Sequence, residues 1–496
     1  MSVREGGRAE FPTGFQRVIV LGVVLVALVA LVSVDRSRSD RATLSVTAAR
    51  ADVAQVDRDV PNQTWFCPGG PLGANATTSV EVANIGDEPA EVAVSAVGDA
   101  AALTFGIPVP AGRVAQTVPA RTVVSFDLND IVAANYAGAI VESRGASIVA
   151  SMHVIADGGY GATPCARDTS SSWFAADGST VRGARLTYFL LNPFPSDAVV
   201  DVAFATSAGR RTPDETQALL VPGRSVAVVE VDKVVLRAEH VAAEAHVRRG
   251  RVVMGRLSQF GDESGRSGTA VSTATPRAST AWYFAHGAFD EGRAQRVALY
   301  NPNDVEADVL VGVPMDDDVV DPFEAKVPAH GYELVQFSGQ DRVRAGQEHS
   351  IVVESVNGVG VVAERWIDGT AGAALGVALG FGVSAPAKQW IVPGVERGGA
   401  STTVWVANFG TASATLTLDV LHDGQIERPP SVQAIQVEPG HRVPLPIPAD
   451  GAEGFAAIAV NADQPVVVQA DRVAAGGKGI GTTAGVPIRS LTTSDG

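Results

Sequence analysis

The sequence predicts an all-β protein, and three observations support this prediction. Valine and alanine dominate the composition, and 52 glycines and 28 prolines interrupt them, which is typical of many short strands joined by turns. Apolar residues alternate along several segments, as at Val309, Val311 and Val313, so these strands should bury one face. The third observation is an internal repeat with a period near 108 residues.

Two residue types mark the repeat. A tryptophan opens each unit, and the separations are 108, 109 and 108 residues between Trp65, Trp173, Trp282 and Trp390. An asparagine follows 18 or 19 residues later, with separations of 108, 109 and 107 residues between Asn84, Asn192, Asn301 and Asn408. Proline or glycine follows each asparagine closely, so we expect an Asx-type turn between two strands. We interpret both markers as structural rather than ligand-binding.

A unit of this length is the size of an immunoglobulin-like β-sandwich. We therefore expect four tandem immunoglobulin-like sandwiches with separate cores, at residues 61–170, 171–278, 279–386 and 387–491. The alternative is a propeller in which each unit supplies two blades of about 40–50 residues.

Local signals within the units predict further elements. We expect a β-hairpin near the end of each unit, with turns at residues 144–145, 249–250, 357–358 and 462–463. Two short helical segments are expected near residues 128–136 and 233–243.

An apolar segment near the amino terminus predicts a transmembrane helix. Residues 18–34 are apolar or small without interruption and would span about 26 Å as a helix, slightly less than a bilayer core. No small-x-small cleavage motif closes the segment, which favours a retained signal anchor over a cleaved signal peptide. We expect residues 1–17 in the cytoplasm and residues 35–60 as a linker.

The two cysteines, Cys67 and Cys165, both lie in the first unit. They lack metal-ligand spacing, so the alternatives are two buried thiols or a disulfide that closes a loop of 98 residues. A lone pair that brackets one domain fits a disulfide in an oxidising compartment better. The expected location is therefore the cell membrane, as a single-pass protein with its bulk outside the cytoplasm.

Composition and motifs argue against several function classes. The formal net charge of -16 repels phosphate backbones, so we expect no nucleic-acid partner. We find no nucleophile elbow, zinc-protease motif or phosphate loop. The sequence therefore predicts no catalytic, cofactor-binding or metal-ligating residues and no cofactor.

Two groups of acidic residues were weighed as weaker candidates. The run at residues 316–318, with Asp321 close by, could bind calcium through its oxygens, although solvated loop charge is the expected role. Glu364 and Asp471 stand beside arginines in the closing strands of the third and fourth units. We interpret them as charge pairs on a strand face rather than as half of a glycosidase dyad.

Several of these features together resemble an uncharacterised actinobacterial family of single-span, secreted or extracytoplasmic proteins. The resemblance rests on the amino-terminal anchor, the Trp-Phe-Cys-Pro-Gly-Gly opening at residues 65–70, the asparagine turns and the Val/Ala-rich strands. It implies location and architecture, and it implies no activity, cofactor or catalytic residue.

The expected function is that of a non-enzymatic scaffold or interaction protein of the cell envelope, anchored by its amino-terminal helix. Its partner would be an envelope protein or glycan, by analogy with other tandem β modules. The alternatives are a cell-wall glycan-binding protein, an accessory or regulatory subunit of an envelope glycan-assembly enzyme, and a hydrolase.

Overall fold

The computed structural model describes most of the compact unit Ala48–Gly496, and every regular element in it is a strand or a short 3-10 helix. The described residues are 56–57, 62–101, 109–156, 159–290, 292–316, 320–369, 375–429, 432, 434–447, 454–474 and 479–489. The all-β prediction is confirmed for them. The expected anchor at residues 18–34 lies outside this part of the chain, and within it no helix is long and apolar enough to cross a bilayer.

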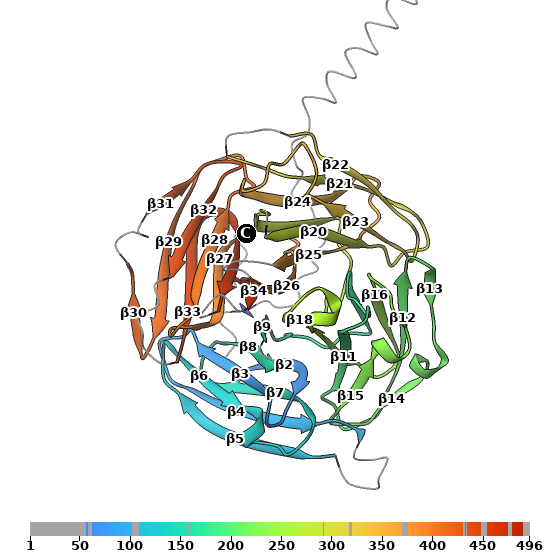
Figure 1. Cartoon of the computed structure of the whole chain (residues 1–496). Helices are drawn as coiled ribbons and strands as arrows, with labels where there is room; N and C mark the ends of the chain where they lie inside the picture. Colours follow the sequence, from blue (N-terminus) through green and yellow to red (C-terminus); the bar gives the residue numbers. More distant parts are fainter. Residues whose placement is uncertain are drawn as a thin grey trace, which may run out of the picture. The chain divides into compact units, whose positions relative to one another are not determined.

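Each 108-residue period forms a pair of four-stranded or five-stranded sheets that we call sandwiches 1 to 4 (Figure 1). Sandwich 1 contains β2 (Asn62–Pro71), β3 (Ala76–Asn84), β4 (Ala90–Gly98), β5 (Ala111–Val118), β6 (Thr122–Asp127), η1 (Leu128–Asp130), β7 (Tyr136–Arg144), β8 (Ile148–Ala156) and β9 (Gly159–Pro164). Sandwich 2 contains β10 (Ser172–Ala175), β11 (Ala184–Asn192), β12 (Ala198–Thr206), β13 (Gly209–Arg211), η2 (Asp214–Thr216), β14 (Leu219–Val221), β15 (Ser225–Glu230), η3 (Val231–Lys233), β16 (Ala242–Arg249), β17 (Val253–Phe260), η4 (Asp262–Ser264) and β18 (Gly268–Thr273).

The second half of the chain repeats this pattern. Sandwich 3 contains β19 (Ala281–Gly287), β20 (Arg293–Tyr300), β21 (Ala307–Gly312), β22 (Phe323–Val327), β23 (Tyr332–Gln336), β24 (His349–Ser355), β25 (Val362–Gly369) and β26 (Gly376–Phe381). Sandwich 4 contains β27 (Ala387–Glu396), β28 (Ser401–Ala407), β29 (Ala414–His422), β30 (Gln425–Glu427), β31 (Ile435–Val437), β32 (Arg442–Ile447), β33 (Phe455–Val473), β34 (Ile480–Ala484) and β35 (Val486–Arg489). In sandwich 4 the long strand β33 takes part in both sheets.

The strand order differs from that of an immunoglobulin domain. In sandwich 1 the two sheets run β2-β7-β4-β5 and β6-β3-β8-β9, and sandwich 3 repeats this order as β19-β24-β21-β22 and β23-β20-β25-β26. An immunoglobulin domain pairs its first strand with its second. Here the first strand pairs with the sixth and the second with the seventh, so the unit is a two-sheet sandwich with its own strand order.

The expected hairpins are also absent from these positions. The turn at Gly145 joins β7 to β8, yet β7 pairs with β2 and β4, whereas β8 pairs with β3 and β9. The turn therefore carries the chain from one sheet to the other, and at 462–463 β33 makes the same crossing without a break. The turn glycines Gly145, Gly250 and Gly358 have positive φ, which explains the sequence signal that suggested a hairpin. The expected helical segments reduce to the single turns η1 and η3.

The four marker asparagines make one identical set of hydrogen bonds. Asn84 accepts a bond from the Gly86 N–H at 3.0 Å and donates to the carbonyls of Glu88 and Val118 at 2.8 and 3.1 Å. Asn192, Asn301 and Asn408 repeat all three bonds in their own sandwiches. The four marker tryptophans are at most 1% exposed. The structural interpretation of both markers is confirmed.

The sandwiches contact one another in cyclic order, so their cores are shared (Figure 1). One continuous apolar cluster joins residues of sandwiches 1, 2 and 4, and another joins sandwiches 3 and 4. Trp390 of β27, for example, packs in the same cluster as Tyr283 of β19. The expectation of four separate cores was therefore wrong, because each sandwich leaves apolar surface that only its neighbours cover.

The start and end of the described chain also meet. Strand β1 (Val56–Asp57) pairs in parallel with β35, matching Val56 with Ile488 and Asp57 with Arg489. Strand β35 pairs in turn with β27 of sandwich 4. Residues expected to belong to a linker therefore add a strand to the last sandwich, next to its junction with the first.

Candidate functional site

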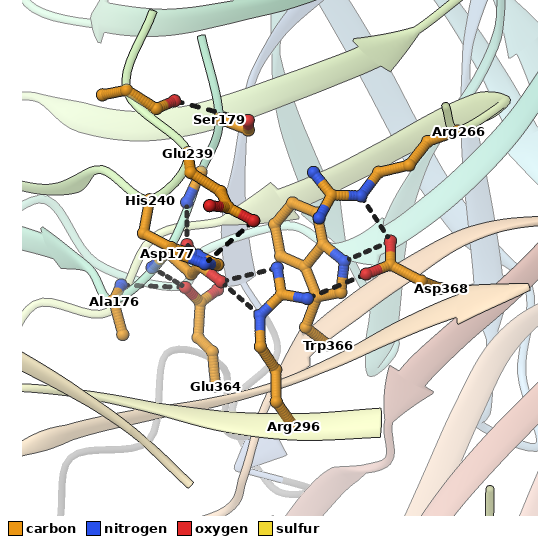
Figure 2. Close-up of polar contacts among 12 residues, drawn as sticks. Ala176, Asp177, Ser179, Glu239, His240, Arg266, Arg296, Glu364, Trp366 and Asp368 are labelled. Atoms are coloured by element: carbon orange, nitrogen blue, oxygen red, sulfur yellow. Dashed lines mark hydrogen bonds and ion pairs between the residues drawn. The ribbon is translucent and has the colours of Figure 1, made fainter. Parts of the chain in front are cut away.

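The buried charges of the described residues gather where one sandwich meets the next. The largest such cluster lies between sandwiches 2 and 3 and brings together Asp177, Arg256, Arg296, Glu364 and Asp368 (Figure 2). Burying ions without partners is costly, so such a cluster marks the most constrained chemistry in the molecule. We therefore treat it as the candidate functional site.

Arg256 and Glu364 form the centre of this cluster. Arg256 projects from β17 of sandwich 2 and Glu364 from β25 of sandwich 3, and both residues are 1% exposed. Arg256 donates to both carboxylate oxygens of Glu364, to Ser272 Oγ at 2.9 Å and to the Asp177 carbonyl. The backbone N–H groups of Ala176 and Asp177 also donate to Glu364 Oε2, at 2.8 and 3.0 Å. Glu364 therefore receives donors from sandwich 2 on all the contacts that hold it.

Asp177 and Arg296 extend the network toward the surface. Arg296 of β20 donates from Nε to Asp177 Oδ2 at 3.0 Å and from Nη1 to Asp368 Oδ2 at 2.8 Å. Its guanidinium carbon lies 4.4 Å from the ring centre of Trp366. His240 Nδ1 lies 3.1 Å from Asp177 Oδ1. Charges therefore alternate across the junction from Arg256 to Asp368 (Figure 2).

The pKa directions agree with charged partners held in place. Burial by itself would raise the pKa of Asp177, but the Arg296 guanidinium and the hydrogen bond with His240 outweigh it and hold the pKa below its usual value. Burial would lower the pKa of Arg256, and the Glu364 carboxylate outweighs it and raises the pKa. Both groups therefore stay ionised across the physiological range.

The junction between sandwiches 3 and 4 repeats this design with different residues. Arg365 of β25 donates to the His286 carbonyl, to Asp471 Oδ1 at 2.7 Å and to Thr482 Oγ1 at 2.6 Å. His286 Nδ1 lies 2.6 Å from Asp471 Oδ2, and its ring stacks on Trp405 at 3.7 Å between centres. Burial would raise the pKa of Asp471, but Arg365 and His286 outweigh it and lower the pKa. Arg365 thus binds sandwich 4 as Arg256 binds sandwich 3.

Sandwiches 4 and 1 meet through a third set of groups. The Arg472 guanidinium lies 3.5 Å from the ring centre of Tyr160, and the Tyr160 hydroxyl lies 2.8 Å from His153 Nδ1. Gly394 of β27 sits against this chain of groups. A Cβ at Gly394 would stand 2.6 Å from His153 Nε2 and 2.7 Å from Ser151 Oγ, and φ is +67°. Only glycine fits here.

The junction between sandwiches 1 and 2 relies on apolar and neutral contacts. Met152 occupies the place in β8 that Arg256 and Arg365 occupy in their closing strands, counted from the residue level with the marker asparagine. The Thr273 N–H donates to Thr163 Oγ1 at 3.0 Å, and Thr273 Oγ1 donates to the Pro164 carbonyl at 2.7 Å. No buried charge is needed at this junction.

The disulfide expected between Cys67 and Cys165 is present. Its Cα atoms are 4.6 Å apart, and both cysteines are fully buried. The bond ties β2 to the segment that follows β9, beside the junction with sandwich 2.

The structure partly corrects the interpretation of the other candidate residues. Glu364 and Asp471 are charge-paired, but with Arg256 and Arg365 of the preceding sandwich rather than with their chain neighbours. Asp316 lies 3.4 Å from Arg442 Nη2, and the described residues contain no group of three His, Cys, Asp or Glu side chains placed to hold a metal ion.

Sequence reasoning missed Asp177, Arg256, Arg296 and His286. A signal for two of them exists, because Asp177 and His286 each stand four residues after a marker tryptophan. Each supplies the carbonyl that the arginine of its own sandwich binds.

Fold and site together define a class: an all-β protein of four sandwiches whose buried charges join one sandwich to the next. The chain belongs to the Family of unknown function (DUF5719), whose family model matches residues 156–255 and 257–493. No curated protein matches the chain significantly.

Three solved structures show weak similarity. Thermotoga maritima 1070 is 16% identical, with 21% of this chain and 91% of that chain covered and a TM-score of 0.19. The Anabaena sensory rhodopsin transducer is 22% identical, with 17% and 84% covered and a TM-score of 0.16. The Streptomyces avermitilis alpha-L-rhamnosidase is 12% identical, with 86% and 57% covered and a TM-score of 0.11. Scores this low carry no argument about fold or function.

Proposed function

We propose that this chain is a non-enzymatic, membrane-anchored scaffold or interaction protein of the cell envelope. The observation that carries the proposal is the use of buried ionisable groups between sandwiches. Arg256 and Glu364 hold sandwiches 2 and 3 together, and Arg365 and Asp471 hold sandwiches 3 and 4 together. Such interlocking suits a rigid platform that presents its outer surface to a partner.

The proposed location rests on two features. Residues 18–34 would form a signal anchor, with residues 1–17 in the cytoplasm and the units at 61–170, 171–278, 279–386 and 387–491 outside. The disulfide between Cys67 and Cys165 supports an oxidising compartment. The resemblance to single-span actinobacterial proteins adds to this proposal.

A protein partner is favoured over a glycan by the distribution of aromatic rings. Among the large apolar side chains that are exposed in the described residues, Phe194 is the one aromatic. Leu220 and Leu236 of the same sandwich are 58% and 72% exposed. A glycan site would be expected to present aromatic faces for sugar rings.

Reporter fusions test the proposed location. A reporter that is active only in the cytoplasm, fused after Gly496, should be inactive, and the same reporter fused ahead of residue 18 should be active. Activity of the carboxyl-terminal fusion would contradict the extracytoplasmic placement.

Two binding assays test the proposed role. Crosslinking in the native membrane should capture an envelope protein, and the folded chain should not sediment with purified cell-wall glycan. Saturable sedimentation with the glycan would replace the scaffold proposal with the glycan-binding alternative.

A further inference from the structure

A small pocket lies where sandwich 4 meets sandwich 1, apart from the junction contacts described above. Tyr160 and Ala162 of β9 form one wall, and residues of β27, β28, β33 and β34 form the others. Thr402 and Arg472 contribute the polar groups that face it from sandwich 4. Its volume is about 30 Å³, which holds about two water-sized groups.

The pocket is lined by buried donors that no protein acceptor satisfies. Thr402 is 5% exposed, and its Oγ1 has no hydrogen-bond partner among the described residues. The same holds, within this part of the chain, for Nε and Nη1 of Arg472, whose side chain is 13% exposed. Buried donors are paired in nearly all native proteins, because an unpaired one loses its hydration without compensation. The pocket therefore calls for an acceptor.

The charges around the pocket favour an anionic acceptor. Arg472 pairs through Nη2 with Glu396, a rim residue whose side chain is 36% exposed. Burial nevertheless lowers the pKa of Arg472, although Tyr160 acts in the opposite direction, so the guanidinium is under-compensated. Burial lowers the pKa of the neighbouring His153 to about 3, which keeps that ring neutral.

The pocket is also particular to this junction. Arg472 stands six residues after the residue level with its marker asparagine, and the equivalent positions in sandwiches 1, 2 and 3 are Val154, Ser258 and Ile367. A guanidinium at this place is therefore absent from the other three closing strands, and the pocket is not a by-product of the repeat.

We propose that this pocket binds the carboxylate group of a small organic acid. The Thr402 hydroxyl and the two unpaired nitrogens of Arg472 donate to its oxygens, and the two oxygens of a carboxylate match the two water-sized groups that the pocket holds. Because sandwiches 1 and 4 both line the pocket, the ligand binds the closed junction and stabilises it by mass action.

Acetate is the probe for this proposal. Thermal unfolding of the full chain in detergent would be followed at pH 7 while acetate replaces chloride at constant ionic strength. The melting temperature should rise by a few degrees and saturate. A flat response, or one that never saturates, would overturn the proposal.

A pair of valine substitutions on one strand provides the matched control. Thr402→Val keeps the shape of the side chain and removes the unpaired hydroxyl, so the acetate midpoint should rise by about tenfold or more. Thr403→Val lies on the opposite face of β28 and should respond as the unaltered chain does. An unchanged midpoint in Thr402→Val, or equal shifts in both variants, would also overturn the proposal.

Discussion

At the residue scale, Glu81 is the clearest source of pH dependence. It is fully buried in β3 and accepts hydrogen bonds from Ser79 and Ser125 at 2.7 and 3.0 Å. Burial raises its pKa from 4.5 to about 7, although both serines act in the opposite direction. The folded state therefore binds more protons than the unfolded state between about pH 4.5 and pH 7. Stability contributed by Glu81 is lost as pH rises through that window, by on the order of 3 kcal/mol.

Glu81→Gln removes this titration and nearly preserves the shape of the side chain. We expect the variant to be more stable than the unaltered chain at pH 8 and to lose that advantage near pH 4.5. Urea denaturation at both pH values measures it, and the difference between the two proteins cancels groups common to both, such as His153. The exposed Glu91→Gln serves as control. A Glu81→Gln advantage that does not depend on pH would contradict the assignment.

The ion pair between Arg256 and Glu364 makes a second prediction at this scale. Glu364→Gln leaves Arg256 buried without a counter-charge, and we expect a loss of about 3–5 kcal/mol in unfolding free energy. Converting both residues to methionine removes both charges, so the double variant should lose less than the sum of the single variants. Denaturant midpoints for the four proteins of this cycle provide the test. Additive losses would mean that the pair does not couple sandwiches 2 and 3.

At the element scale, Gly394 of β27 tests the contact between sandwiches 4 and 1. Gly394→Ala introduces a Cβ against His153 and Ser151 and places a non-glycine residue at φ +67°. Gly440→Ala in the same sandwich has φ +77° and open space around its Cβ, so it reports backbone strain alone. We expect Gly394→Ala to cost about 1–3 kcal/mol more than Gly440→Ala. Equal costs in thermal unfolding would show that the two sandwiches do not touch at Gly394.

The disulfide between β2 and the segment after β9 makes a prediction at the same scale. Cys67→Ser opens a loop of 98 residues, which a chain-entropy model values at about 4–5 kcal/mol. Because Cys67 and Cys165 belong to the cluster that also holds Leu190 of sandwich 2, the loss should lower one common unfolding transition. Thiol labelling of the unreduced, denatured chain should find no free thiol. Two labelled thiols per chain would refute the bond.

At the scale of the whole molecule, the sequence predicted the strands and their period but not how the sandwiches meet. The asparagine turns were predictable because each needs only its own residues and a nearby proline or glycine. The positive φ of Gly145 was also visible as a turn signal, but a turn residue does not say which sheet the next strand joins. Pairing across sandwiches depends on contacts between residues about 108 positions apart, which no local pattern encodes.

The same limit applies to the candidate site. Glu364 and Asp471 were recognisable as charge-paired because buried-looking strands rarely carry lone carboxylates. Their partners were assigned to the adjacent residues, whereas Arg256 and Arg365 reach them from the preceding sandwich. Spatial pairing of this kind follows from the cyclic contacts, and the sequence offered only the recurring position of the arginines as a hint.

The central claim of this account is that the four sandwiches form one cooperative unit. Differential scanning calorimetry of residues 48–496 tests it most directly, by comparing the calorimetric enthalpy of unfolding with the van't Hoff enthalpy. Shared apolar clusters and buried ion pairs predict a single transition with a ratio near 1, shifted as a whole by Cys67→Ser and by Glu364→Gln. A ratio of about 4, with each substitution moving only its own part of the trace, would show four independent domains and contradict the account.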